Sequence, residues 1–172
     1  MPKQIEDLVD HYWGAINYIA SLIKASEIKA GLILSFYGIA LGFIIDSIGT
    51  VYETIESNTV FSVLSMIWFV LVGASIFFSV RCFMPRLETQ FDENVFFFKD
   101  IISKYGDIHS YSQKLYEVST EEEELFRQLG HQIYINSKIA SLKFENVKRS
   151  LYCLAWSFAV IMVFLIYYFF FQ

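Results

Sequence analysis

The three longest apolar stretches of this sequence contain no acidic or basic residue. They cover residues 30–45, 60–80 and 151–171, and no Asp, Glu, His, Lys or Arg lies inside any of them. Proton relays, ion-coupled transporters and voltage sensors need such groups within the membrane, and most secondary transporters also contain internal repeats. The chain has neither feature, so we do not expect a stand-alone transporter.

Patterns of catalytic and metal-binding residues are also missing. The three histidines lack metal-ligand spacing with one another, and the two cysteines, Cys82 and Cys153, form no Cys-x-x-Cys pair and indicate no disulfide. The run Glu121–Glu124 fits a helix start, where the helix dipole favours acidic side chains. We therefore expect no enzyme, no bound metal and no cofactor, and the net charge of −5 gives no reason to expect a nucleic-acid partner.

Basic residues are distributed very unevenly around the apolar stretches. There is no Lys or Arg from Asp46 to Thr59, whereas ten lie between Arg81 and Ser150. Basic residues near the ends of membrane spans mark the cytoplasmic side. Together with a hydrophobic content of 55%, this pattern predicts three transmembrane helices (30–45, 60–80 and 151–171) in a lipid bilayer, with the N-terminus and residues 81–150 cytoplasmic.

The remaining residues show helical periodicity. Residues 1–29 predict an amphipathic helix, which either lies on the membrane surface or, as we favour, packs on other cytoplasmic helices and continues into the first span. A second helix is predicted over Leu87–Tyr105, followed by a polar turn over Gly106–Ser112. Thr120 and the acids after it form a capping-box start for a helix that continues into the third span.

These elements predict an all-α membrane protein that folds as a single unit over residues 1–172. Three transmembrane helices are joined to a cytoplasmic helical bundle, because each amphipathic face needs a partner. Gly38 and Gly42, with Gly31 and Ser35, place small residues four apart on the first span. Such pairs allow two helices to approach closely, either within one chain or between copies, and we expect a homo-oligomer.

Several polar residues fall close to the predicted cytoplasmic membrane face. Lys29, Arg86 and Lys143 either follow the positive-inside bias or form a pocket for a small anion, for which Arg and Lys suit phosphate. Asn136 lies on an apolar helix face, where it either makes a buried hydrogen bond or binds a ligand. Tyr134 offers a ring for stacking. We predict these five residues as the ligand site.

The order of short motifs resembles that of a known family. Ser26-Glu27-Ile28-Lys29-Ala30 opens the first span, Phe83-Met84-Pro85-Arg86-Leu87 follows the second, and Gln132-Ile133-Tyr134 leads to Ser137, Ile139-Ala140 and Lys143 before the third. With the same arrangement of spans, this order resembles the transmembrane effector family of the Pycsar antiphage system, often called PycTM. Glu27 departs from the family pattern, in which Asp is expected.

The resemblance implies a function that composition alone does not. In such systems a partner nucleotide cyclase makes cUMP or cCMP, and the membrane effector responds by impairing the bacterial inner membrane, which leads to growth arrest or cell death. It therefore implies a cyclic mononucleotide as the activating ligand. Two further hypotheses stay open: a non-enzymatic scaffolding membrane protein, and a small oligomeric channel or accessory subunit.

Overall fold

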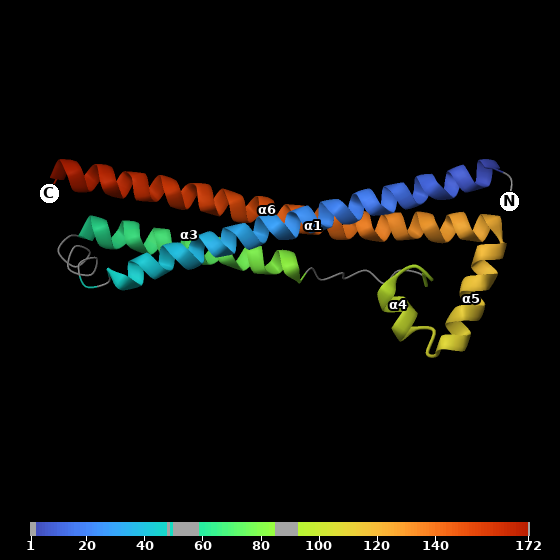
Figure 1. Cartoon of the computed structure of the whole chain (residues 1–172). Coiled ribbons are helices and arrows are strands. Elements are labelled where there is room, and N and C mark those ends of the chain that lie inside the picture. Colours follow the sequence, from blue (N-terminus) through green and yellow to red (C-terminus); the bar gives the residue numbers. More distant parts are fainter. Residues whose placement is uncertain (1–2, 48, 50–58, 85–92, 172) are drawn as a thin grey trace. The chain divides into compact units, whose positions relative to one another are not determined.

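The structure is a computed structural model that describes residues 3–47, 49, 59–84 and 93–171, and every regular element among these residues is a helix. Figure 1 shows the elements in chain order, which are α1 (Lys3–Asp46), α3 (Thr59–Phe83), α4 (Phe98–Ser103), α5 (Ile108–Thr120) and α6 (Glu122–Phe171). This confirms the predicted all-α class. Both α1 and α6 are uninterrupted, so the amphipathic N-terminal segment continues into the first predicted span, and α6 continues into the third.

Three of these helices, α1, α3 and α6, are long and apolar enough to cross a membrane. Only 6% of the most apolar window of α6 is buried inside the protein, and large apolar side chains such as Met66, Val70 and Trp156 are more than 60% exposed. An outward-facing surface of this kind is unfavourable in water and favourable in lipid. The chain is therefore a membrane protein with three spanning helices, as predicted.

The described residues form two compact units. The membrane unit comprises residues 25–85 and 142–172, and the amphipathic unit comprises residues 1–24 and 86–141. The organisation as a single unit over 1–172 stays a prediction.

The membrane unit packs buried side chains that recur at intervals of three, four or seven residues. On α3 these are Phe61, Trp68, Val72, Ser75, Ser79 and Cys82. On α1 the series is Ser26, Ala30, Ile33 and Tyr37, and on α6 it is Lys143, Val147, Ser150 and Ser157. Alternating steps of three and four residues are typical of helices that cross at shallow angles with interlocking side chains.

The amphipathic unit has a separate apolar core. Ile16 of α1 lies in one cluster with Val95, Val118, Leu125 and Leu129. Two aromatic contacts extend this core, with ring centroids 5.3 Å apart for Tyr12–Phe126 and 5.7 Å apart for Trp13–Phe96. The apolar face of residues 3–24 is therefore partly covered by protein, with Ile16 buried and Leu8 and Trp13 about 40% exposed.

The helix predicted over Leu87–Tyr105 is confirmed for Phe98–Ser103 and wrong for residues 93–97. Residues 93–97 are irregular, and only Phe98–Ser103 is helical. The reason is local: the Asn94 side chain accepts a hydrogen bond from the backbone N–H of Phe96 at 2.8 Å, a turn that competes with helix formation. Residues 85–92, which include Pro85, lie outside the described residues.

The polar turn predicted over Gly106–Ser112 is wrong from residue 108 onward. Asp107 is the N-cap of α5, because its side chain accepts hydrogen bonds from the backbone N–H groups of His109 and Ser110. These bonds lower the pKa of Asp107. Thr120, predicted to start the next helix, is instead the last residue of α5, and its hydroxyl donates to the carbonyls of Tyr116 and Glu117. The helix that reaches the third span begins at Glu122.

Candidate functional site

The five residues predicted to bind a ligand fall into different parts of the structure. Lys29 and Lys143 belong to the membrane unit, and Tyr134 and Asn136 belong to the amphipathic unit. Arg86 lies outside the described residues. As a ligand set, the five residues stay a prediction.

Lys143 is the most deeply buried of the predicted cations. Its side chain is 5% exposed, and its ammonium group lies 2.6 Å from a carboxylate oxygen of Glu27. It also donates a hydrogen bond of 2.9 Å to the carbonyl of Cys82. Because α3 ends at Phe83, this carbonyl is one of the last four in the helix and has no partner within it. Lys143 thus satisfies the negative end of α3 as well as a carboxylate on α1.

Lys29 is placed differently, although it lies only two residues from Glu27. It is exposed, and its ammonium group lies 5.5 Å from the centroid of the Phe144 ring. A cation over an aromatic face at the surface is weakly held. Lys29 therefore retains a charge that can meet an anion, whereas Lys143 already has two partners.

Asn136 forms an amide pair with Gln132, one turn earlier on α6. The Gln132 side chain is almost fully buried, and its Nε2 donates to Oδ1 of Asn136 at 3.2 Å. The side-chain carbonyl oxygen of Gln132, Oε1, is buried without a hydrogen-bond partner. Such an acceptor in a folded protein is uncommon, because leaving it unpaired costs about 1–3 kcal/mol.

Tyr134 does not share this amide pair's face of α6. A helix turns by about 100° per residue, so Tyr134 lies about 200° from both Gln132 and Asn136. Its side chain is 61% exposed, in agreement with that position. The structure therefore places Tyr134 and Asn136 on different sides of the same helix.

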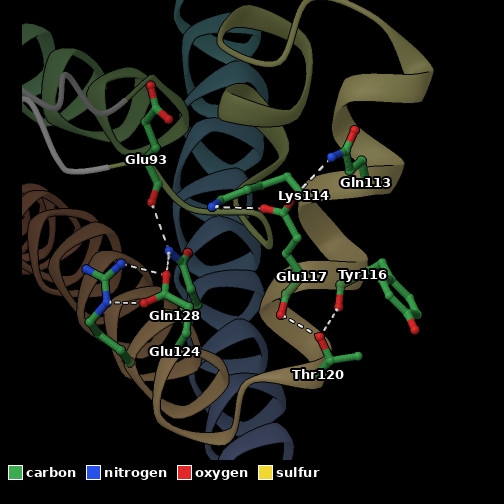
Figure 2. Close-up of polar contacts among 9 residues, drawn as sticks. Glu93, Gln113, Lys114, Tyr116, Glu117, Thr120, Glu124 and Gln128 are labelled. Carbon is green, nitrogen blue, oxygen red and sulfur yellow. Dashed lines mark hydrogen bonds and ion pairs between the residues drawn. The ribbon is translucent and has the colours of Figure 1, made fainter.

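A second buried amide, Gln128, fastens the irregular segment 93–97 to α6. Its Oε1 accepts from the backbone N–H of Val95 at 3.2 Å. Figure 2 shows its Nε2 directed to the carbonyl of Glu93 and the carboxylate of Glu124, at 3.3 and 2.9 Å. The backbone carbonyl of Gln128 accepts from the amide of Asn94 at 2.7 Å. Each polar atom of the Gln128 side chain has a partner, which is typical of a structural role.

The carboxylate of Glu124 links this amide to the surface. Arg127 binds it through two nitrogens, at 2.6 and 2.7 Å. The hydrogen bonds from Arg127 and Gln128 lower the pKa of Glu124 to about 2. The neighbouring part of α5 also carries an exposed ion pair, Lys114–Glu117 at 3.5 Å (Figure 2). Among the described residues, no group of three or more His, Cys, Asp or Glu side chains is arranged to hold a metal.

Sequence reasoning missed Gln132 and the internal role of Glu27. Gln132 is part of the motif before the third span, but we did not predict it as a site residue. Its position four residues before Asn136, on the same apolar helix face, could have indicated that the two side chains meet. Glu27 lies 116 residues from Lys143 in sequence, and nothing in either local pattern indicates that the two meet.

Three spanning helices and an amphipathic helical unit define a helical multi-pass membrane protein. The sequence profile of the PycTM family, the Pycsar effector protein domain, matches residues 11–170. The chain therefore belongs to the Pycsar effector protein family.

A curated relative supports the same assignment. The Pycsar effector protein PtPycTM of Propioniciclava tarda is 26% identical over 144 residues, which cover 81% of this chain and 69% of that protein. No solved structure matches the chain significantly. Family membership assigns the chain to antiphage defence that works through a cyclic pyrimidine signal and is linked to a nucleotide cyclase.

Proposed function

We propose that this protein is a non-enzymatic effector that binds cUMP or cCMP and then impairs the bacterial inner membrane. Its family supports the class of signal, and its three apolar helices support the membrane as the place of action. The observation that carries the ligand proposal is the unpartnered, buried carbonyl of Gln132 beside the amide of Asn136.

The amide pair suits a pyrimidine base for a chemical reason. The hydrogen-bonding edge of uracil carries an N–H donor between two carbonyl acceptors, and that of cytosine carries an amino donor. An unpaired carbonyl such as that of Gln132 gains a partner from either donor, and an amide nitrogen supplies the complementary donor. Binding would remove the penalty of an unpaired buried acceptor, so the ligand is favoured by more than the new hydrogen bond alone.

The charged part of the ligand needs a cation. Lys29, Arg86 and Lys143 remain the cations that the sequence predicts for such a phosphate. Within the membrane unit, Lys143 can bind a phosphate only by exchanging Glu27 for it. Such an exchange would alter the contact that now joins α1, α3 and α6. A ligand shifts a conformational equilibrium only when it binds one state better, and replacing this ion pair is one way to do so. We propose this exchange as the link between ligand binding and the spanning helices.

The test uses the full chain in detergent and a panel of cUMP, cCMP, cAMP and cGMP. We expect a saturable rise in unfolding temperature with a pyrimidine nucleotide and a much smaller rise with the purines. Gln132→Leu should weaken pyrimidine binding about tenfold to a hundredfold, since one buried contact is lost. Gln113→Leu, on an exposed face of α5, is the matched control and should bind like the parent.

A second measurement addresses the effect on the membrane. In liposomes that contain the protein and a trapped dye, the preferred pyrimidine nucleotide should cause dye release, whereas the same nucleotide should leave protein-free liposomes intact. If no pyrimidine nucleotide binds, the ligand proposal is wrong and a scaffold or accessory subunit becomes the better hypothesis. If one binds without release, the proposed effect on the membrane is wrong.

A further inference from the structure

Basic side chains gather at the end of the membrane unit where α3 ends. Five basic residues lie there beside only two acidic ones, Glu27 and Glu145, in a protein whose net charge is −5. The opposite end of the unit carries no Lys or Arg among its described residues. Lys143 is buried and paired with Glu27, whereas the other four basic residues are exposed: Lys29, Arg81, Lys148 and Arg149. The membrane unit is therefore positive at one end.

Each of these four exposed cations lies over an aromatic ring, at 5.5 to 6.0 Å from its centroid. Two of the rings are neighbours on α3. Arg81 of the same helix lies over Phe77, and Arg149 of α6 lies over Phe78. The centroids of these two rings are 5.5 Å apart. Arginines from two different helices thus share one aromatic pair.

The arginine of α3 lies at the depth of lipid headgroups. Arg81 follows Thr59, where α3 begins, by 22 residues, which is about 33 Å along the helix axis. The hydrocarbon core is about 30 Å thick, so a helix that crosses it along its axis places Arg81 just outside the core. Phe77, one turn deeper, is 57% exposed, and Val70, two turns further on, is 65% exposed. The same face of α3 therefore combines a cation at the membrane boundary with an apolar surface for acyl chains.

Both arginines keep hydrogen-bond donors for an anion. Arg81 forms no ion pair with any residue that the structure describes. Arg149 contacts the carboxylate of Glu145 through one nitrogen, which leaves other donors of its guanidinium group available. The hydroxyls of Ser79 and Ser150 are 2.7 Å apart, so the two arginines lie at one level of the unit. The planar donors of a guanidinium group match two oxygens of a phosphate.

We propose that Arg81 and Arg149 bind the phosphate of an anionic phospholipid, whose acyl chains lie along the exposed apolar face of α3. The excess of basic residues at this end favours a lipid with a net negative charge over a zwitterionic one. A lipid bound in this way joins α3 and α6 from outside and stabilises the membrane unit. Neither arginine is a predicted contact of cUMP or cCMP, so this inference goes beyond nucleotide sensing and does not depend on it.

The test measures the unfolding temperature of the full chain in uncharged detergent micelles. Dioleoyl phosphatidylglycerol, which is anionic, is compared with dioleoyl phosphatidylcholine, which has the same acyl chains and no net charge. Inorganic phosphate is the probe without acyl chains. Arg81→Lys keeps the charge but loses the planar donors, whereas Lys148→Gln removes a charge at the same end and outside the arginine pair. The unfolding temperature of each variant without lipid verifies that it folds.

We expect phosphatidylglycerol to raise the unfolding temperature of the parent with saturation, while phosphatidylcholine and inorganic phosphate have little effect. Arg81→Gln and Arg149→Gln should each weaken phosphatidylglycerol binding about fivefold, which corresponds to about 1 kcal/mol for one basic residue near a lipid surface. Arg81→Lys should also weaken it, because an ammonium group does not bind two phosphate oxygens as a fork does. Lys148→Gln should bind nearly like the parent.

Three results would overturn the proposal. Equal effects of the two lipids would mean that the apolar face binds acyl chains without selecting the charge of the headgroup. Equal losses in Lys148→Gln and Arg81→Gln, together with parent-like binding by Arg81→Lys, would mean that the positive end attracts anionic lipids only diffusely. Stabilisation by inorganic phosphate as large as that by phosphatidylglycerol would assign the arginines to a soluble anion.

Discussion

The two units bury polar side chains between helices by different means. In the membrane unit, serine hydroxyl groups join the helices. The hydroxyl of Ser150 forms hydrogen bonds of 2.7 and 2.9 Å with the hydroxyls of Ser79 and Ser75. All three residues are fully buried. In the amphipathic unit, the amide of Gln128 holds an irregular backbone segment against α6, and the carboxylate of Glu124 accepts a hydrogen bond from that amide.

The surroundings of each unit account for this difference. Helices in lipid gain little from burying apolar side chains, so small residues that allow close approach and a few interhelical hydrogen bonds hold them together. Hydroxyl groups of serine meet both needs in α3 and α6. The backbone of residues 93–97 is irregular and does not pair its own polar groups as a helix does. A glutamine side chain, which carries both a donor and an acceptor, can form hydrogen bonds with several of these backbone atoms at once. The polar groups therefore support helix contact in one unit and an irregular loop in the other.

The largest effect is expected from Gln128→Leu in the amphipathic unit. This change leaves the N–H of Val95 and the carbonyl of Glu93 without their partner. The N–H of Val95 is buried, whereas Glu93 is exposed, so most of the loss comes from the N–H. An unpaired buried group costs about 1–3 kcal/mol, and the unit should lose about that much unfolding free energy. Hydrogen exchange of residues 93–97 measures this loss directly. Gln113→Leu on exposed α5 serves as the control, and equal exchange in the two variants would contradict the role given to Gln128.

A smaller, pH-dependent effect is expected from Glu124. Its pKa is lowered to about 2 in the folded protein, chiefly by the hydrogen bond from Arg127. A carboxyl with a lowered pKa stabilises the fold above its unfolded pKa of about 4.5 and loses this contribution as the pH falls towards 2. Because Arg127 is half exposed, solvent weakens the interaction, and we expect Glu124 to contribute about 1–2 kcal/mol to the free energy of unfolding.

Thermal unfolding of the protein between pH 6 and pH 3 measures this contribution. Glu124→Gln should be less stable than the parent at pH 6, and the difference between the two proteins should shrink at pH 3. Glu117→Gln, which removes an exposed ion pair with Lys114, should follow the parent closely. A constant difference between Glu124→Gln and the parent across this range would show that the charge of Glu124 does not matter.

In the membrane unit, the corresponding deletion is Ser150→Ala. It removes the hydroxyl that joins Ser75 and Ser79, yet these residues keep other possible partners, including the carbonyl of Ser150. Measured hydrogen bonds between membrane helices average about 0.6 kcal/mol, and we expect a loss of about 1 kcal/mol or less. Unfolding of the parent and of Ser150→Ala in mixed micelles measures this loss of stability. A loss as large as that of Gln128→Leu would remove the contrast between the two units.

Sequence patterns predicted the parts of the fold that depend on long periodic signals. The apolar lengths of residues 60–80 and 151–171 are sufficient to mark spans, because only helices satisfy their own backbone in lipid. The continuity of α1 and of α6 followed from the lack of a helix breaker between amphipathic and apolar segments. Helix starts were less accurate: Asp107 provides a cap that the polar composition of its neighbours concealed.

The contacts of the candidate site depend on distant partners, which local patterns do not encode. Lys143 has the same sequence signature whether it follows the positive-inside bias or forms an ion pair with Glu27. Gln132 reads as one polar residue on an amphipathic helix, and its unpaired carbonyl is visible only once the neighbouring side chains are placed. Asn136, by contrast, was predicted as a special residue from its position on an apolar face.

The smallest effect on the fold is expected at Gly38 and Gly42. Both are exposed, and an added Cβ atom at either position meets no heavy atom within 4 Å. Replacing both with Leu should therefore leave the unfolding temperature of the monomer unchanged or slightly raised, since Gly is about 1 kcal/mol less favourable in a helix than Ala. A contact between copies is different, because close approach of two helices requires small residues.

Crosslinking in membranes, read together with unfolding in detergent, separates these two roles. If the glycine pair forms the contact in the predicted homo-oligomer, the double variant loses the crosslinked species while the monomer stays folded. Gly73→Leu on α3, also exposed and without neighbours at its Cβ position, is the matched control. An unchanged oligomer in the double variant would mean that Gly38 and Gly42 face lipid, and that the copies associate through another surface.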